Sequence, residues 1–225
     1  MIRDREEAGR LLAQRLGAYC DDPDALILAL PRGGVAVGYT LSLALHLPLD
    51  VLITRKLGAP GNPEYAMGAL SETGAIFLNP DAERIINAGI WSRVHLADTI
   101  QAQRGEITRR QTLYRSGRPL PSLSDRSVLL VDDGVATGST FLASIKALRG
   151  LNVQRLIAAL PVGPVDTLSE ISRTVDELVV LLAPEPFFAV GNHYEDFKQV
   201  EDEEVIRYLA SAADGLRDRN HAAHA

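Results

Sequence analysis

The chain has 225 residues, of which 46% are apolar and 23% charged, and its formal net charge is -6. This composition fits one globular domain with a sizeable core, and the negative charge disfavours nucleic acids and anionic membranes, which bind through clustered Lys and Arg. Cys20 is the only cysteine, which excludes an internal disulfide and suits a reducing, cytoplasmic compartment. No apolar run is long enough to cross a bilayer.

The first predicted elements alternate between helix and strand. An amphipathic helix is expected over 4–19, where packing explains the apolar spacing, and a buried strand over 25–30. The turn from Pro31 to Gly34 then leads into a helix over 35–46. Glycines before a helix let backbone N–H groups approach an anion closely, although a plain turn between strand and helix explains the same residues.

The next strand is predicted over 50–57 and carries Arg55 and Lys56 near its C-terminal end. Ligands gather at the C-terminal ends of strands in open α/β sheets, so these two cations are candidates for binding an anion. A solvated charge at the edge of the sheet is the alternative for Arg55.

Residues 58–124 form a stretch too long for a simple connection, so it is expected to be structured. Two short strands are predicted around 71–74, and a helix over 81–114 with a break near 87–89. Several arginines near the end of this helix either close over a ligand or form a solvated face that pairs with Glu106. The second interpretation is favoured, because charge runs usually lie at the surface.

The next strand, over 128–131, consists of four branched aliphatic residues and ends in Asp132 and Asp133, before an amphipathic helix over 141–148. Carboxylates accept the two hydrogen bonds that a sugar diol donates, and a helix N-terminus binds phosphate. A solvated acidic turn followed by a helix cap is the alternative. Small and hydroxyl residues lie between the acids and the helix: Gly134, Val135, Ala136, Thr137, Gly138, Ser139 and Thr140.

The rest of the chain continues the alternation, with strands predicted over 153–161 and 177–183 and helices over 165–174 and 205–216. Strands that alternate with helices predict a parallel sheet with right-handed crossovers. The carboxyl edge of this sheet is expected to bring the glycine turn, the two cations and the two acids together.

The segment from Val128 to Thr140 resembles the signature by which type I phosphoribosyltransferases bind 5-phosphoribosyl 1-diphosphate (PRPP). The resemblance extends over most of 25–197 and implies an α/β fold with a three-layer parallel sheet, an inserted hairpin and helix region that forms a flexible loop, and a small C-terminal hood. It implies one phosphoribosyltransferase domain over 1–225, with a core over about 20–57 and 125–183, an inserted region over 58–124, a hood and C-terminal helix over 184–217, and a loose tail over 218–225.

The resemblance also implies roles for the residues singled out above. Asp132 and Asp133 would hold the ribose hydroxyls, and Mg²⁺ would bind at these acids, partly through PRPP and water. The expected catalytic residues are Asp132, Asp133, Arg55 and Lys56. The expected PRPP-binding residues are Arg32, Gly33, Gly34, Asp132, Asp133, Gly134, Val135, Ala136, Thr137, Gly138, Ser139 and Thr140.

The resemblance defines less well which molecule would accept the phosphoribosyl group of PRPP. The run from Phe188 to Gly191 resembles the hood of hypoxanthine-guanine phosphoribosyltransferases, which makes Phe187, Phe188 and Val190 candidates for binding a base. Packing between the sheet and the last helix explains these side chains equally well. Enzymes for 6-oxopurines carry an acid immediately before the Thr-Gly pair, where this chain has Ala136, so the base is left open.

The resemblance predicts a magnesium-dependent enzyme that transfers the phosphoribosyl group of PRPP to a nitrogen nucleophile, most simply a nucleobase. A regulator that senses PRPP or a nucleotide without turnover is the alternative. The expected partners are PRPP and a small nitrogen-containing acceptor, with no nucleic acid and no membrane, and a homodimer is an option that the sequence leaves open.

Overall fold

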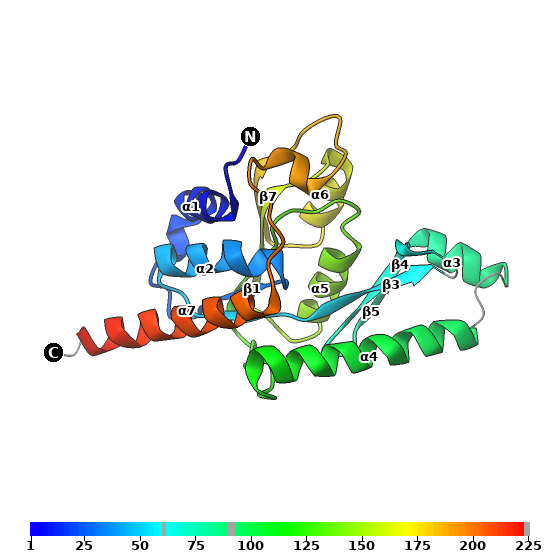
Figure 1. The fold of residues 1–225 in the computed structure, drawn as a ribbon, viewed down its shortest axis with the longest axis horizontal. Helices are drawn as coiled ribbons and strands as arrows, with labels where there is room; N and C mark the ends of the chain where they lie inside the picture. The colour runs from blue at the N-terminus through cyan, green and yellow to red at the C-terminus, as the bar shows by residue number, and fades with distance from the viewer. Residues whose placement is uncertain (60–61, 90–92, 223–225) are drawn as a thin grey trace. The chain divides into compact units, whose positions relative to one another are not determined.

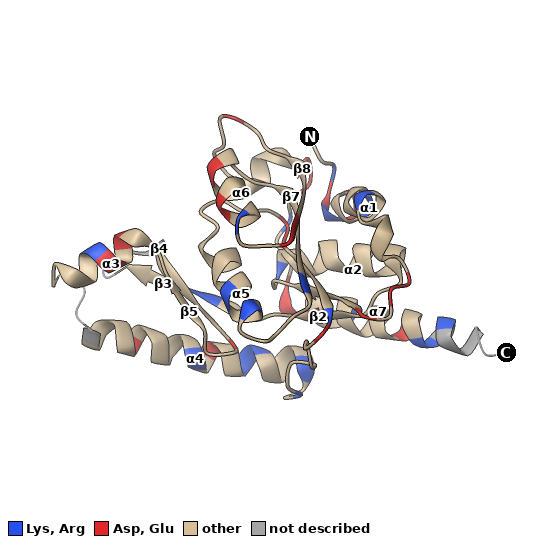
Figure 2. Ribbon diagram, turned by 180° about the vertical axis from the view of Figure 1, so that it is seen from behind, with Lys and Arg blue, Asp and Glu red and all other residues tan. Residues whose placement is uncertain are grey.

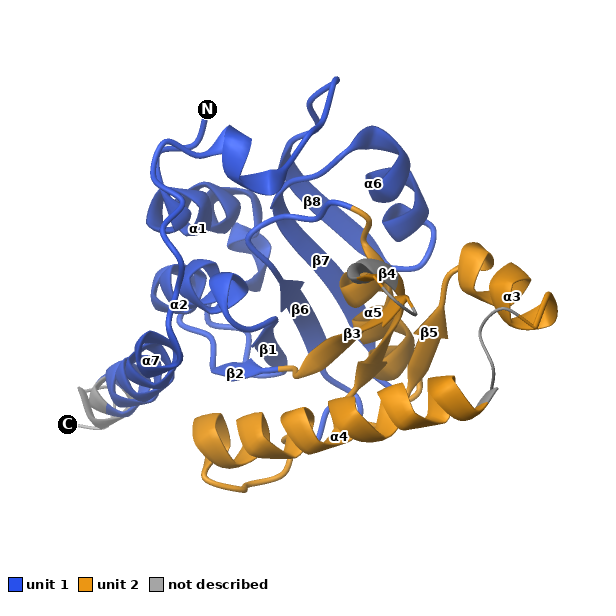
Figure 3. Ribbon diagram, turned by 45° about the vertical axis from the view of Figure 1, so that its right-hand side comes forward, with its two compact units in different colours: residues 1–51, 122–136, 152–225 blue, residues 52–121, 137–151 orange. Residues whose placement is uncertain are grey.

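The computed structural model describes residues 1–59, 62–89 and 93–222. The chain forms two compact units, which are coloured separately in Figure 3. The first unit contains residues 1–51, 122–136 and 152–225, and the second contains residues 52–121 and 137–151. The boundary between Ala136 and Thr137 falls inside the signature segment, so each unit carries part of it.

The first unit is built on a five-stranded sheet with the strand order β2-β1-β6-β7-β8. Every neighbouring pair is parallel, which confirms the predicted α/β fold with a parallel central sheet (Figure 1). The C-terminal ends of parallel strands lie at one edge of a sheet, so this edge gathers the loops that follow them. The strands are β1 (Ala25–Ala29), β2 (Leu49–Val51), β6 (Ser127–Val131), β7 (Arg155–Val162) and β8 (Glu177–Leu182).

Helices flank this sheet. The first helix begins after Asp4, whose carboxylate accepts a hydrogen bond of 2.7 Å from the N–H of Glu7 and so caps the helix. Fully buried Leu12 and Leu41, from the first two helices, join Ile27 in the hydrophobic core. The helices and 3₁₀ turns of the unit are α1 (Arg5–Arg15), η1 (Gly17–Tyr19), α2 (Gly33–Leu45), α6 (Val165–Ser172), η2 (Val190–His193) and α7 (Asp202–Ala222).

The second unit contains a three-stranded antiparallel sheet with the order β3-β4-β5. The two strands expected around residues 71–74 are confirmed, and the helix expected over 81–114 is divided, as predicted, into two. Thr54 and Ser144 share a buried hydrogen bond of 2.8 Å that joins β3 to α5. The elements are β3 (Thr54–Ala59), β4 (Asn62–Ser71), β5 (Ile76–Leu78), α3 (Pro80–Asn87), α4 (Arg93–Arg115) and α5 (Ser139–Arg149).

The predicted single strand over 50–57 is wrong. Its first residues belong to β2 of the parallel sheet, whereas Thr54 begins β3 of the antiparallel sheet. Leu52 and Ile53 are fully buried between the two strands, so the apolar pattern continues through the break and hides it. Arg55 and Lys56 therefore do not lie at the C-terminal end of a parallel strand.

The last helix is longer than predicted. It starts at Asp202, three residues before the expected start at Val205, and continues to Ala222 instead of ending at Leu216. The predicted loose tail over 218–225 is therefore wrong over 218–222, which belong to this helix, and residues 223–225 lie outside the described residues. Within the described ranges, no helix is both long and apolar enough to span a membrane.

Candidate functional site

The two signature acids follow β6 directly, next to the loop that follows β1. These strands are paired in register, with Ala29 opposite Val131, and the N–H of Leu30 donates to the carbonyl of Val131 at 2.9 Å. The glycine turn after β1 is therefore brought against Asp132 and Asp133. Two of the three predicted sets of binding residues meet at the same edge of the first unit.

The glycines of this turn are needed for close contact with the acids. A Cβ atom on Gly33 would lie 1.9 Å from Oδ2 of Asp133, and one on Gly34 would lie 2.9 Å from Cα of Asp132. No ordinary side chain fits at either position without displacing an acid. Glycine at these positions allows the loop backbone to pack directly against the acid pair.

We expect Gly33→Ala to weaken PRPP binding by about 10-fold or more, because the new methyl group displaces the carboxylate of Asp133 and small misplacements are costly. Titration calorimetry with Mg²⁺ and PRPP measures the change. Gly17→Ala is the matched control in the same unit, since a Cβ there has no neighbouring atom within 4 Å. Equal losses in the two variants would show that the contact with Asp133 has no role.

The acid pair is electrostatically unusual. Burial raises the pKa of Asp132 well above its usual range, and the negative charge of Asp133 is the second largest cause of this shift. Oδ1 of Asp132 accepts a hydrogen bond of 2.9 Å from the N–H of Asp133. The guanidinium of Arg5 lies 2.7 Å from Oδ2 of Asp133 and supplies the compensating positive charge.

Arg32 directs its side chain away from this pair. Its Nη1 atom donates to Glu201 at 3.0 Å and lies 3.8 Å from Asp202, at the start of α7. Any role of Arg32 in binding PRPP would therefore fall to its backbone while these ion pairs persist. The peptide bond between Pro31 and Arg32 is cis.

The predicted hood lies against the signature segment. Gly134 has a φ of 149°, and a Cβ there would lie 2.6 Å from Cγ1 of Val190. Tyr194 donates from its hydroxyl to the carbonyl oxygen of Asp133 at 2.7 Å. Phe187 packs against the core and stacks on His193, with ring centroids 5.3 Å apart. Phe188 is 78% exposed and does not fill the core.

Other signature residues contact their own unit. Val135 is buried and donates from its N–H to the carbonyl of Val162 at 2.9 Å, and the carbonyl of Ala136 accepts from Thr167 at 2.9 Å. These bonds hold the loop after the acids against the next strand and its helix.

In the second unit, the remaining signature residues lead into α5, which begins at Ser139. Gly138, with a φ of 71°, precedes the helix, and the hydroxyls of Thr137 and Ser139 lie 3.3 Å apart. Thr140 is the second residue of α5, so its N–H is among those that have no partner within the helix. These N–H groups and the positive end of the helix suit a phosphate.

Arg55 and Lys56 lie on opposite faces of β3, because successive residues of a strand point to opposite sides. Arg55 donates to Gln103 of α4 at 3.1 Å, and burial, with the nearby positive charge of Arg110, lowers its pKa. Lys56 is on the same face of the strand as Thr54, which bonds to α5. Of the two cations, Lys56 is therefore on the face that packs against α5.

The arginine-rich helix α4, whose basic residues are blue in Figure 2, pairs two of its arginines with its own Glu106, as the favoured interpretation predicted. Glu106 accepts hydrogen bonds of 2.8 Å from both Arg109 and Arg110. These bonds lower the pKa of Glu106 to about 2, and the bond from Arg109 has the largest effect. Arg115 differs from the others because it is buried and forms an ion pair with Glu72.

The lowered pKa of Glu106 predicts a pH-dependent contribution to stability. It should be fully present above the ordinary glutamate pKa of 4.5 and lost as the pH falls toward about 2. Comparing the free energies of unfolding of the wild type and Glu106→Gln across this range isolates the effect, which should stay below about 1 kcal/mol because the pair is partly exposed. If the wild type instead gained stability over Glu106→Gln as the pH falls, the predicted contribution of Glu106 would be contradicted.

The acid pair fits Mg²⁺ only in part. Carboxylate oxygens are ligands that Mg²⁺ prefers, and it commonly uses one or two of them together with substrate phosphates and water. Among the described side chains, the one group of three or more ligand residues close enough for a metal ion is Cys20, Asp21 and His46, away from the signature. Asp132 and Asp133 thus suit a Mg²⁺ ion that the substrate also holds.

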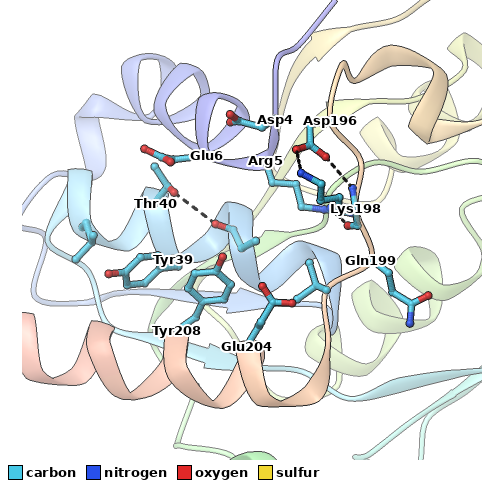
Figure 4. A pocket seen from close by; sticks show the side chains of 13 residues that line it. Asp4, Arg5, Glu6, Tyr39, Thr40, Asp196, Lys198, Gln199, Glu204 and Tyr208 are labelled. Atoms are coloured by element: carbon cyan, nitrogen blue, oxygen red, sulfur yellow. Dashed lines mark hydrogen bonds and ion pairs between the residues drawn. The ribbon is translucent and has the colours of Figure 1, made fainter.

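Arg5 also lines a pocket of about 380 Å³, which lies between α1, α2, α7 and residues 196–200 (Figure 4). Tyr39 and Tyr208 line it, with ring centroids 4.9 Å apart. None of the predicted binding residues lines this pocket. Arg5 borders the pocket and also bonds to Asp133, so it links the pocket to the acid pair.

The sequence did not indicate Arg5 as part of the site. Its partner Asp133 is 128 residues away, and the helix that carries it has the spacing of an ordinary packing helix. Tyr194 contacts the same acid through a backbone carbonyl. Neither contact leaves a local pattern that spacing or composition could reveal.

Comparisons with known proteins agree with this geometry. The model of the family described as Phosphoribosyl transferase domain matches residues 4–194. Two Mycobacterium tuberculosis proteins, named "Putative phosphoribosyl transferase Rv0571c" (strain H37Rv) and "Putative phosphoribosyl transferase MT0597" (strain CDC 1551), are 40% identical over 214 residues. The match covers 94% of this chain and 47% of each relative, so the chain spans about half of their length.

A solved structure is also similar. The crystal structure of the protein TT1426 from Thermus thermophilus aligns with a TM-score of 0.77 and 38% sequence identity. The alignment covers 93% of this chain and 98% of that one.

Proposed function

The chain belongs to the phosphoribosyl transferase domain family, and from this premise we propose that it transfers the 5-phosphoribosyl group of PRPP to a nitrogen nucleophile and releases diphosphate. The observation that carries the proposal is the packing of Gly33 and Gly34 against Asp132 and Asp133 at the ends of adjacent parallel strands. Carboxylates that accept hydrogen bonds from a diol lie beside a loop that can bind an anion. This pair suits a sugar that carries a diphosphate at C1.

Each part of PRPP has a matching group. The carboxylates of Asp132 and Asp133 accept hydrogen bonds from the 2- and 3-hydroxyls of the ribose. Backbone N–H groups at Gly33 and Gly34 donate to the diphosphate, and the N-terminus of α5, with the hydroxyls of residues 137–140, binds the 5-phosphate. The second set lies in the other unit, joined to the first through the bond between residues 136 and 137.

Of the two cations, we assign the diphosphate to Lys56. Arg55 already donates to Gln103 on the face of β3 that packs on α4. Lys56 lies on the face toward α5, whose N-terminus we assign to the 5-phosphate of the same substrate. Its positive charge would offset the negative charge that builds up on the departing diphosphate.

In the reaction, the acceptor nitrogen forms a bond to C1 while the bond from C1 to the diphosphate oxygen breaks. The electron pair of the broken bond leaves with the diphosphate, and positive charge develops on the ribose ring. The proton of the acceptor N–H is released to water once the new bond has formed. Catalysis then comes mainly from holding the two reactants in line and from neutralising the leaving group. Mg²⁺, held by Asp132, Asp133 and the substrate, would supply further positive charge at the diphosphate.

We propose a nucleobase as the acceptor. The exposed ring of Phe188 is available to stack on a planar heterocycle, and Val190 lies against Gly134, next to the acids. Phe187 is held by the core and by His193, so it supports the hood instead of contacting a base. A small acceptor, a cytoplasmic location and assembly as a homodimer complete the proposal.

Incubation with Mg²⁺, PRPP and a panel of nucleobases, with diphosphate release as the readout, tests the proposal. Release with at least one base, and none without PRPP, is the expected result. Tight PRPP binding without release for any base would favour a PRPP sensor on the same fold. Absence of PRPP binding would refute the proposed function.

A further inference from the structure

Arg5 makes a paired contact with one of the signature acids. Its Nε and Nη2 atoms lie 2.8 Å and 2.7 Å from the same oxygen, Oδ2 of Asp133. The two side chains are only 11% and 16% exposed. An arginine–carboxylate contact of this kind is charge-assisted, and its partial burial limits screening by solvent.

The guanidinium of Arg5 is itself held on its remaining sides. Nη1 donates to the carbonyl of Lys198 at 2.7 Å, as Figure 4 shows, and the guanidinium carbon lies 4.0 Å from the centre of the Phe197 ring. Tyr194, three residues earlier in the same segment, donates to the carbonyl oxygen of Asp133. Arg5 is therefore a rigid link between residues 194–198 and the acid.

Gly33 completes the arrangement. A Cβ on this residue would lie 1.9 Å from Oδ2 of Asp133 and 3.0 Å from Nε of Arg5. The backbone of Gly33, the carboxylate of Asp133 and the guanidinium of Arg5 thus pack closely together. The side chain of Asp133 therefore has little freedom to rotate. A carboxylate fixed in this way loses less conformational entropy when a ligand binds.

We propose that Arg5 is a positioning residue, which fixes the carboxylate of Asp133 in the orientation that receives the ribose of PRPP and ties it to residues 194–198. This inference rests on the proposed function and adds to it a residue from the first helix. Arg5 does not contact the substrate; it acts through Asp133. Its effect on PRPP affinity should therefore vanish when Asp133 can no longer act.

A double-mutant cycle on PRPP affinity tests this dependence. Arg5→Gln, Asp133→Ala and the double variant are titrated with Mg²⁺ and PRPP by calorimetry, up to millimolar PRPP. We expect Arg5→Gln to weaken binding by about 10- to 100-fold, the usual effect of removing a residue that orients a binding group. In the Asp133→Ala background, the same change should alter the dissociation constant by less than about twofold, because the group through which Arg5 acts is absent.

Two further variants separate positioning from folding. Arg5→Lys keeps the charge but not the planar fork, so it should recover part of the lost affinity. Arg10→Gln, on the same helix, removes a surface ion pair with Glu6 and should bind PRPP as the wild type does. The calorimetric stoichiometry reports the fraction of folded molecules, so misfolding of Arg5→Gln would not be mistaken for weak binding.

The outcomes distinguish this inference from the proposed function. Wild-type affinity in Arg5→Gln, or an equal loss with and without Asp133, would overturn the positioning role while leaving the proposed function intact. A wild-type protein that binds no PRPP would overturn the proposed function, and the positioning role with it.

Discussion

Replacing both signature acids, Asp132→Asn with Asp133→Asn, should abolish measurable PRPP binding. The change removes both carboxyl groups and places amide donors where the ribose hydroxyls need acceptors. Each lost charge-assisted hydrogen bond is worth about 1.5–3 kcal/mol, so together they weaken binding by about 10² to 10⁴-fold. Titration calorimetry with Mg²⁺ and PRPP measures the loss.

The fold should survive this double substitution. Asparagine has nearly the size of aspartate, and its side-chain oxygen can still accept from Arg5, so that guanidinium does not lose its partner. Asp166→Asn with Glu170→Gln, on the exposed face of α6, exchanges two acids for amides in the same unit and serves as the control. Undiminished PRPP affinity in the signature variant would contradict the role of the acids.

Glu72→Ala should cost the second unit about 3–5 kcal/mol of stability, the usual effect of leaving one member of a buried ion pair without its partner. The side chains of Glu72 and Arg115 are 3% and 2% exposed. Glu72 also accepts from the N–H of Ile53 at 2.8 Å and from Gln111 at 2.9 Å, so three donors lose their acceptor together. Urea unfolding measures the change in free energy.

Glu106→Ala is the matched control for Glu72→Ala. It removes an acid from the same unit that also pairs with two arginines, but at the surface, so it should cost less than about 1 kcal/mol. Glu72→Gln should fall between the two, since the amide oxygen can still accept one hydrogen bond. Equal unfolding midpoints for Glu72→Ala and Glu106→Ala would show that burial adds nothing to the pair.

Much of the fold could be predicted because its signals are local. The aliphatic strand before Asp132, the glycines around it and the amphipathic helix after Thr140 occupy consecutive residues, and they form β6 and α5 as expected. Alternating strands and helices then fix a parallel sheet, because such connections are right-handed and place successive strands side by side. The adjacency of the glycine turn and the acids follows from that order.

Other features depend on contacts between distant residues. The break between β2 and β3 leaves no sign in the sequence because Leu52 and Ile53 are as deeply buried as strand residues. The pattern therefore predicts the wrong sheet for Arg55 and Lys56. Arg5 reaches Asp133 only after the first helix packs on the sheet. No periodicity or spacing carries such information, because the partner is chosen by the tertiary fold.

The most direct test is a crystal structure of the protein with Mg²⁺ and PRPP. We predict that the ribose hydroxyls lie within hydrogen-bond distance of Asp132 and Asp133, the diphosphate at the backbone of Gly33 and Gly34, and the 5-phosphate at the N-terminus of α5. Density for PRPP in the pocket beside Tyr39 and Tyr208, with the two acids free of ligand, would contradict the account.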